Sequence, residues 1–143
     1  MKKPSDAKSN EKQHDPFALL LDENLSSKSI IQGLLGHNIP VHPQTYVAPR
    51  GVTDDDLLLA LAEHDNLYLL SRDQDFRYHS ATQKRLMDSG IGAFVITSSG
   101  NKNSQEIIAL ITKAWRRIQK FISKTKRPFV AKVTSEGKVQ AHK

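Results

Sequence analysis

Carboxylates follow two apolar runs of the sequence, at the point where each run ends. Asp22 comes directly after residues 17–21, and Asp73 and Asp75 follow residues 67–70. A buried strand that ends in acidic residues is a costly arrangement unless something cationic meets them. If the two strands are parallel, these carboxylates converge at one edge of a sheet, where sites form in such folds.

A hard divalent cation relieves the repulsion among carboxylates that are brought together. Mg²⁺ binds a few carboxylates and keeps several waters, which leaves positions for a phosphate oxygen and an attacking hydroxide. Such a metal acidifies water and neutralises the charge that grows on phosphorus-bound oxygens. This chemistry predicts hydrolysis of a phosphodiester without a side-chain nucleophile.

Each carboxylate also has a structural explanation. Residues 54–56, all aspartates, stand at a helix start marked by Thr53, where acids satisfy free amide groups and favour the helix dipole. Asp73 could cap a helical turn, and Asp75 could be a solvated loop acid. The acidic residues after the first apolar run are the hardest to explain without a cation.

Charge is divided unevenly along the chain. From residue 101 onward there are eleven Lys/Arg against two Asp/Glu, whereas the first hundred residues carry ten against thirteen. A basic surface beside an acidic site suits a polyanionic substrate, although a merely solvated basic helix is the alternative. We expect Arg72, together with Ser71, to contact substrate phosphate, since Arg binds phosphate in a forked geometry, although a simple surface arginine is the alternative. We expect a docking surface on one face of a long helix, formed by Lys113, Arg117, Lys120 and Lys124.

Several classes of protein are disfavoured by composition. The chain has no cysteine, which removes disulfides, thiolate metal sites and cysteine nucleophiles and fits the cytoplasm. Its apolar runs are far shorter than the ~20 residues needed to cross a bilayer, so we expect no membrane partner. No Gly-rich phosphate loop is present, which argues against a nucleotide-driven motor or kinase.

Apolar runs alternate with segments of helical spacing. Strands are predicted at residues 17–21, 39–41, 67–70 and 93–96, and helices at 30–35, 53–62, 81–88 and 104–122. This alternation predicts an α/β fold with a mostly parallel central sheet flanked by helices. Residues 129–133 and 138–140 flank Ser-Glu-Gly and predict a C-terminal β-hairpin.

The length of the chain predicts one domain with a sizeable core. Residues 1–15 are almost entirely polar and cannot offset their ordering entropy by burial. We therefore expect a disordered N-terminal arm at 1–15 and a single domain at 16–143.

Three motifs, in order, resemble a known family. They are Leu-Leu-Asp-Glu-Asn-Leu-Ser at 20–26, Gly-Val-Thr-Asp-Asp at 51–55 and Leu-Ser-Arg-Asp-Gln-Asp-Phe at 70–76. Together they resemble the PIN-like domain families, particularly the VapC-like toxin branch that opens with an Asp-Glu-Asn (DEN) motif. The resemblance covers about residues 17–97, and the ending at 126–133 also looks like the tail of that branch.

The resemblance implies a three-layer PIN-like fold with an acidic Mg²⁺ or Mn²⁺ site. By position the site residues are Asp22, Asp55, Asp73 and Asp75, with Glu23 facing either the metal or the core edge. The run of three aspartates lets the helix-start role fall on Asp54 or Asp55, and the spacing to Ala62 and Ser71 favours Asp55.

The resemblance further implies a metal-dependent endoribonuclease that is the toxin of a type II toxin–antitoxin system. Its expected partners are RNA and a cognate antitoxin protein, and a homodimer stays open. The alternatives are a catalytically inactive PIN-like module that binds RNA or regulates, and a receiver-like phospho-acceptor. A receiver needs an acceptor Asp at the end of a later strand, whereas Ile96 leads to Thr-Ser-Ser-Gly. The presence of all four carboxylates favours the nuclease.

Overall fold

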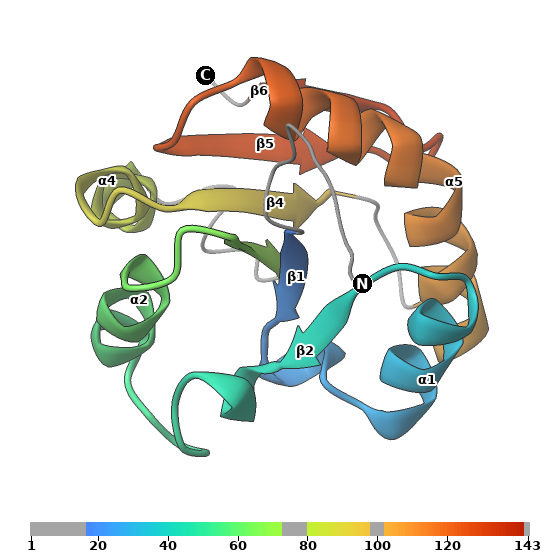
Figure 1. The fold of residues 1–143 in the computed structure, drawn as a ribbon, viewed down its shortest axis with the longest axis horizontal. Coiled ribbons are helices and arrows are strands. Elements are labelled where there is room, and N and C mark those ends of the chain that lie inside the picture. Colours follow the sequence, from blue (N-terminus) through green and yellow to red (C-terminus); the bar gives the residue numbers. More distant parts are fainter. Residues whose placement is uncertain (1–16, 73–79, 98–101, 142–143) are drawn as a thin grey trace, which may run out of the picture.

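A single mixed sheet forms the centre of the molecule in the computed structural model, which describes residues 17–72, 80–97 and 102–141. Within these residues the strand order is β2-β1-β3-β4-β5-β6 (Figure 1). Strands β1 to β5 pair in parallel, and β6 pairs antiparallel with β5. The bounds are β1 (Ala18–Leu21), β2 (Val41–Pro43), β3 (Leu67–Ser71), β4 (Gly92–Ile96), β5 (Phe129–Val133) and β6 (Val139–Ala141).

Helices connect the parallel strands, because neighbouring parallel strands need a crossover connection. In the described residues these are α1 (Lys28–Gly36), α2 (Asp54–Ala62), α4 (Ser80–Asp88) and α5 (Ser104–Lys124). Short 3₁₀ turns follow the first two strands, η1 (Glu23–Leu25) after β1 and η2 (Gln44–Tyr46) after β2. The predicted α/β fold with a mostly parallel sheet, flanking helices and a C-terminal hairpin is confirmed.

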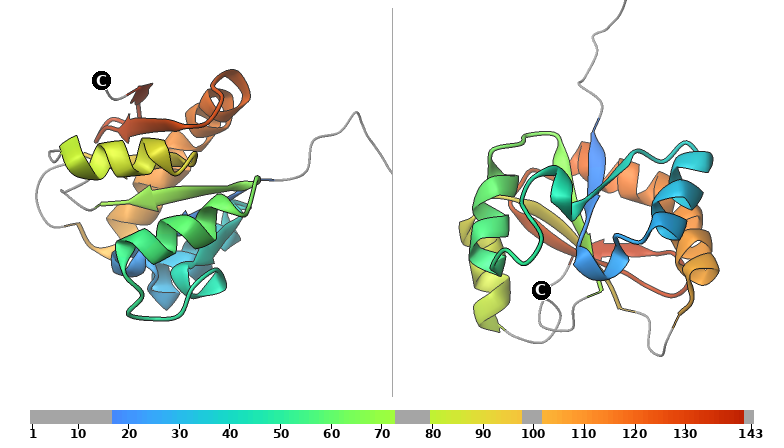
Figure 2. Two further views of the ribbon diagram at one scale, coloured as in Figure 1. Left: turned by 90° about the vertical axis from the view of Figure 1, so that its left-hand side faces the viewer. Right: turned by 90° about the horizontal axis from the view of Figure 1, so that it is seen from below.

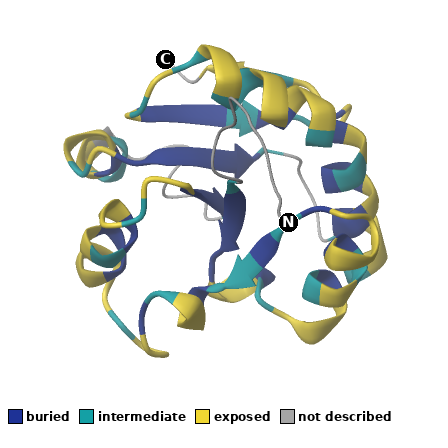
Figure 3. Ribbon diagram, viewed as in Figure 1, coloured by how far each residue is buried: buried dark blue, intermediate teal, exposed yellow. Residues whose placement is uncertain are grey.

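Helices cover both faces of the sheet, which gives three layers (Figure 2). In β1, Leu19 and Leu21 belong to the cluster that includes α1 and α5, whereas Leu20 belongs to the cluster that includes α2 and α4. Strands covered on both faces are continuous apolar runs, which explains the sequence of β1. Figure 3 shows the central strands mostly buried and the exposed residues on the outer faces of the helices.

The long helix α5 begins at Ser104, where the predicted helix begins. Asn103, rather than Ser104, is the N-cap: its side chain accepts from the Glu106 backbone N–H at 2.9 Å. The Glu106 carboxylate in turn accepts from the Asn103 backbone N–H at 3.0 Å, which completes a capping box. Ser104 is therefore the first helical residue, and the apolar stripe of the helix is buried against the sheet.

Strand β2 also lies later than expected, at Val41–Pro43 instead of residues 39–41. After α1, Asn38 adopts a left-handed backbone conformation (φ 62°). The residues that follow it bring the chain back to the sheet before β2 begins. The Pro40 carbonyl accepts from the Leu19 backbone N–H at 2.9 Å and starts the pairing. Pro43 is tolerated because β2 is an edge strand.

The expected N-terminal arm at residues 1–15 lies outside the described residues. Among the helices that the structure describes, none combines the length and apolar character that a membrane span requires.

Aromatic rings pack directly on the backbone of β4 at Gly92. A Cβ atom at this position would lie 2.7 Å from Phe129 Cζ and 2.7 Å from Tyr68 Cδ2. Phe129 is the neighbour of Gly92 in the register of β4 and β5, and its ring also packs on Phe121, with 4.9 Å between centroids. The aromatic cluster therefore depends on the absence of a side chain at Gly92.

We expect Gly92→Ala to lower the free energy of unfolding by about 1–3 kcal/mol, because the rings must shift to admit a methyl group. Gly36→Ala is the matched control. No atom lies within 4 Å of its added Cβ, so this change in α1 should raise the free energy of unfolding by about 0.4–1 kcal/mol. Urea unfolding of both variants measures the two effects. A Gly92→Ala variant as stable as the wild type would contradict the close packing.

Candidate functional site

The carboxyl ends of β1 and β3 place Asp22 beside Ser71. The two strands pair in parallel, with Leu21 opposite Leu70, and the Asp22 backbone N–H extends the ladder to the Leu70 carbonyl at 3.1 Å. Asp22 and Ser71 are thus the next pair in register, at the edge where parallel sheets form their sites. The sequence-based prediction that Asp22 stands at this edge agrees with the fold.

The Asp22 carboxylate is buried, with 8% of the residue exposed, and both of its oxygens accept hydrogen bonds. Oδ1 accepts from the Leu25 backbone N–H at 3.1 Å, so Asp22 caps η1. Oδ2 accepts from the hydroxyl of Ser71, which is fully buried. A buried carboxylate needs such partners, and here they fix its orientation.

Ser26 ties the turn after β1 to the turn after β2. Its hydroxyl donates to the carbonyl oxygens of Leu21 and Asp22, at 2.8 Å each, and accepts from the Gln44 backbone N–H at 3.2 Å. Gln44 is itself buried. The residues of the DEN segment and of η2 are therefore held together as one edge of the site.

A pocket of about 130 Å³ opens at this edge of the sheet. Its polar lining residues come from three elements: Asp22, Glu23 and Asn24 after β1, Gln44 in η2, and Asp54 in the first turn of α2. Leu57 and Leu69 form its apolar wall. Three carboxylates thus border one small pocket.

The two candidate aspartates of α2 lie in different surroundings. Asp54 borders the pocket with Asp22, whereas the Asp55 carboxylate lies 3.3 Å from the Nε atom of Arg85 in α4. Both partners of this ion pair are well exposed, so the pair contributes little to stability. Thr53 caps the helix by accepting from the Asp56 backbone N–H at 3.1 Å, which leaves the carboxylate of Asp54 available to the pocket.

The structure describes only one of the other predicted acidic residues. Glu23 is exposed and borders the pocket, while Asp73 and Asp75 lie outside the described residues. Within the described residues alone, no three acidic or histidine side chains converge closely enough to form a metal site. Arg72 is half-buried directly after β3.

The basic residues of α5 lie along its outer side. Lys113, Arg117, Lys120 and Lys124 are all exposed. The helix connects the carboxyl end of β4 with the amino end of β5, so its last turns lie toward the opposite edge of the sheet from Asp22. Arg117 also has a structural partner, because its Nη1 donates to the Gly137 carbonyl of the β5–β6 turn at 3.2 Å.

His42 in β2 is a group near this edge whose pKa departs from its ordinary value. Burial lowers the pKa of His42, so the imidazole is neutral around pH 7. Its ring stacks on Tyr46, with 3.8 Å between centroids and 9° between planes. His42 therefore acts here as an aromatic packing surface.

Three residues of this edge have roles that the sequence pattern does not indicate. Ser71 is a buried donor to Asp22, Asp54 borders the pocket as well as standing at the helix start, and Gln44 is buried. A signal for Ser71 is present in the sequence, since it stands at the same register position as Asp22 once the strands are aligned. The positions of Gln44 and Asp54 depend on tertiary packing.

Comparison with known proteins agrees with this architecture. A family model described as a PIN like domain matches residues 18–98, more than half of the chain. The match begins with β1 and extends just past β4, so it contains the edge that carries Asp22, Ser71 and Asp54. Searches of curated proteins and of solved structures give no match. The chain belongs to the PIN-like domain family.

Proposed function

We propose that this protein is a Mg²⁺- or Mn²⁺-dependent endoribonuclease, and that it is the toxin of a type II toxin–antitoxin pair. Membership of the PIN-like family indicates a nuclease-type function in general. The observation that carries the proposal is the buried Asp22 carboxylate, fixed at the carboxyl edge of a parallel sheet beside a pocket that Asp54 also borders.

The residues around the pocket fit a hard divalent cation. Their side chains offer carboxylate and amide oxygens, which are the ligands that Mg²⁺ and Mn²⁺ prefer. In the proposal Asp22 and Asp54 hold the metal, Glu23 assists, and Asp73 and Asp75 complete the set as the motif implies. When bound, the metal would acidify a water molecule and neutralise charge on the phosphate oxygens.

The protein itself orients the Asp22 carboxylate. The Leu25 N–H and the Ser71 hydroxyl hold the Asp22 carboxylate in one position, so little reorganisation is needed when ligands arrive. Ser71 is therefore a positioning residue. In hydrolysis, the water oxygen forms a new bond to phosphorus as the bond to the leaving ribose oxygen breaks. Arg72 is proposed to bind the phosphate, and its fork of N–H donors suits this role.

RNA and an antitoxin protein are the proposed partners. An acidic pocket repels an RNA backbone, so attraction must come from basic surface elsewhere. The cations on the outer side of α5 provide such a surface, and the same face could bind an acidic segment of an antitoxin. The competing hypothesis is an inactive PIN-like module that binds RNA by this surface without cleaving it.

Single-residue variants distinguish the roles of Asp54 and Asp55 in α2. We expect Asp22→Asn and Asp54→Asn each to lower Mg²⁺-dependent RNA cleavage by more than about 100-fold, since outer ligands alone contribute roughly 10- to 100-fold. Asp55→Asn should change cleavage less than about 3-fold, because its carboxylate pairs with Arg85 outside the pocket. Cleavage of a labelled RNA, with EDTA as a blank, measures all three. Loss of activity in Asp55→Asn alone would return the helix-start role to Asp55.

Folding of these variants is checked independently. In Asp22→Asn the side chain keeps an oxygen for the Leu25 N–H and gains an amide that can donate to the Ser71 oxygen, so the free energy of unfolding should stay within about 1 kcal/mol of wild type. Asp22→Ala should cost about 1–3 kcal/mol, because it takes this acceptor from the buried Ser71 hydroxyl and removes the cap of η1. Urea unfolding distinguishes lost chemistry from lost structure.

The toxin assignment makes a separate prediction. Induced expression of the wild-type chain should arrest growth of a bacterial host, and Asp22→Asn at the same protein level should not. Unimpaired growth with an RNA-cleaving protein would leave the nuclease intact and contradict the toxin role. Equal arrest by both proteins would show that the effect does not depend on cleavage.

The basic surface of α5 is tested by the salt dependence of RNA binding. Each phosphate that a protein binds on a single strand adds about −0.7 to the slope of log affinity against log salt. Replacing Lys113, Lys120 and Lys124 by Gln in the Asp22→Asn background should flatten that slope by about 0.7 for each phosphate that these lysines bind in the wild type. Filter binding at several salt concentrations gives the slopes. Identical slopes would show that these lysines only solubilise the helix.

A further inference from the structure

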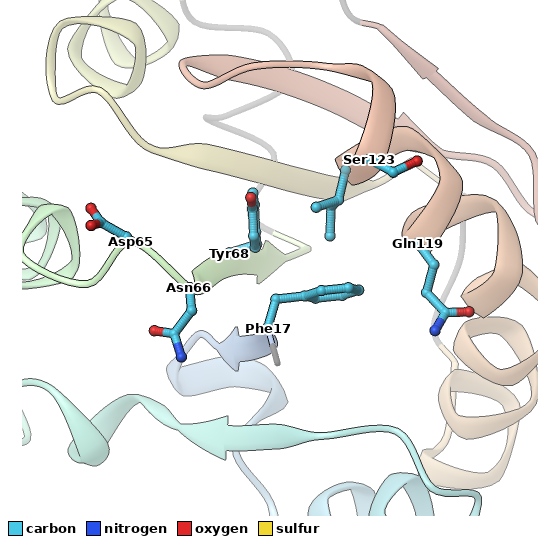
Figure 4. A pocket seen from close by; sticks show the side chains of 7 residues that line it. Phe17, Asp65, Asn66, Tyr68, Gln119 and Ser123 are labelled. Atoms are coloured by element: carbon cyan, nitrogen blue, oxygen red, sulfur yellow. The ribbon is translucent and has the colours of Figure 1, made fainter. Parts of the chain in front are cut away.

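Two adjoining cavities lie at the amino end of the sheet, opposite the edge that carries Asp22. One has a volume of about 420 Å³ and includes Phe17, just before β1, and Tyr68 in β3 (Figure 4). The other, about 490 Å³, is bordered by Lys124, Lys126 and Arg127 between α5 and β5. The cavities share Tyr68, Ile122 and Ser123, so they form one continuous site with an apolar half and a cationic half.

The hydroxyl of Tyr68 is a polar group at the centre of this site. Tyr68 is 9% exposed, and within the described residues its hydroxyl makes no hydrogen bond. Burial raises the pKa of Tyr68, and the opposing effect of Arg127 is smaller, so the phenol stays protonated and can donate. Buried hydroxyl groups normally have partners, and both cavities border this residue.

The apolar half of the site is shaped by aromatic rings. Phe17 and Tyr68 meet edge to face, with 6.0 Å between centroids, and Figure 4 shows Asn66 and Gln119 at the margin of the same cavity, one from the strand side and one from α5. Aromatic and aliphatic walls suit a flat ring, and amide side chains suit the donors and acceptors at the edge of such a ring.

The cationic half favours a negatively charged group next to that ring. Lys124 is exposed at its rim beside Lys126, and the Arg127 guanidinium lies 5.6 Å from the centre of the Tyr68 ring. Arg127 also donates to the His64 carbonyl at 3.2 Å and to Asp65 at 3.3 Å, which fixes it in place. Arg and Lys together are the side chains that bind phosphate.

We propose that these two cavities form a nucleotide-binding site, with the base in the apolar half and the phosphate on the cations of the other half. Their volumes fall in the range of small-molecule sites, about 300–1,000 Å³. The ligand is a 5′-phosphorylated nucleotide, either free or as the end of an RNA. The proposal does not depend on the proposed nuclease function, because the site shares no residue with the pocket at Asp22.

Other occupants fit the observations less well. An acidic peptide would use the cations, but aromatic rings with the amide side chains of Asn66 and Gln119 beside them match a base more closely than an extended backbone. The chain's own residues 1–15 carry four Lys against three Asp/Glu and so have no net negative charge to pair with the cations.

The full-length Asp22→Asn protein should be titrated with AMP, GMP, CMP and UMP by calorimetry and by the fluorescence of Trp115. This residue is the only tryptophan of the chain, and its ring lies 5.5 Å from that of Phe17, so it reports on the apolar half. We expect at least one nucleotide to bind with a Kd on the order of 10–100 μM, as its size allows. Inorganic phosphate should bind at least roughly 10-fold more weakly and leave the fluorescence unchanged.

Three variants test the assigned roles. The double variant Lys124→Gln, Lys126→Gln should weaken nucleotide binding about 10-fold or more, whereas the matched double variant Lys28→Gln, Lys138→Gln, at two exposed lysines that line neither cavity, should not change it. Tyr68→Phe should weaken binding about 2- to 10-fold without lowering stability, because it removes only the hydroxyl. Equal weakening by both lysine pairs would reveal nonspecific attraction and overturn the site.

Two RNA oligonucleotides separate the sources of the ligand. If a 5′-phosphorylated oligonucleotide binds at least as tightly as AMP and its dephosphorylated form does not, the ligand is an RNA end; tighter binding of free AMP identifies a free nucleotide. The proposal fails if none of the four nucleotides binds at concentrations up to about 1 mM. It also fails if an acidic peptide changes the Trp115 fluorescence and the nucleotides do not. The same holds if deletion of residues 1–15 changes this fluorescence and the nucleotides do not.

Discussion

The parallel pairing of β1 with β3 is the constraint on which the candidate site depends. Leu21 lies opposite Leu70, so Asp22 and Ser71 emerge side by side and on the same face. A slip of one residue would turn every side chain of β1 to the other face, because side chains alternate with a period of two. A slip toward the core is costly, because it would move Asp22 into the position of Leu21, which is fully buried. The hydrophobic core therefore fixes the position of the carboxylate.

Helix phase decides which aspartate of α2 can join Asp22. Successive residues of an α-helix point about 100° apart, so neighbouring carboxylates in one turn face different surroundings. The buried residues Leu57, Leu58 and Leu61 set the rotation of α2 against the sheet. With that rotation Asp54 borders the pocket and Asp55 meets Arg85 of the neighbouring helix. Packing of the helix thus decides which of the three neighbouring aspartates borders the pocket.

The parts of the structure that sequence can predict are those governed by local pattern. The apolar runs and helical spacings indicate the parallel sheet, the flanking helices and the hairpin, and the acidic residue after the first run places Asp22 at the sheet edge. The choice of Asp54 over Asp55 at the pocket, and the role of Ser71 as a donor to Asp22, depend on strand register and helix rotation. The spacing of residues in one sequence indicates neither the strand register nor the helix rotation. The position of Gln44 cannot be predicted from local pattern either, because its backbone is held by Ser26, eighteen residues away.

The cations at one end of the molecule have little electrostatic effect on the carboxylates at the other end. Helix α5 has 21 residues and is therefore about 31 Å long, which is several times the screening length of about 8 Å at physiological salt. The cations near Lys124 consequently do little to offset the negative charge around Asp22. At the Asp22 end, two of the groups that donate to the carboxylate, the Leu25 N–H and the Ser71 hydroxyl, are uncharged. Glu23 and Asp54 border the same pocket and add to its negative charge. A cation bound in the pocket would offset this charge at short range, which is the physical reason for proposing a divalent metal there.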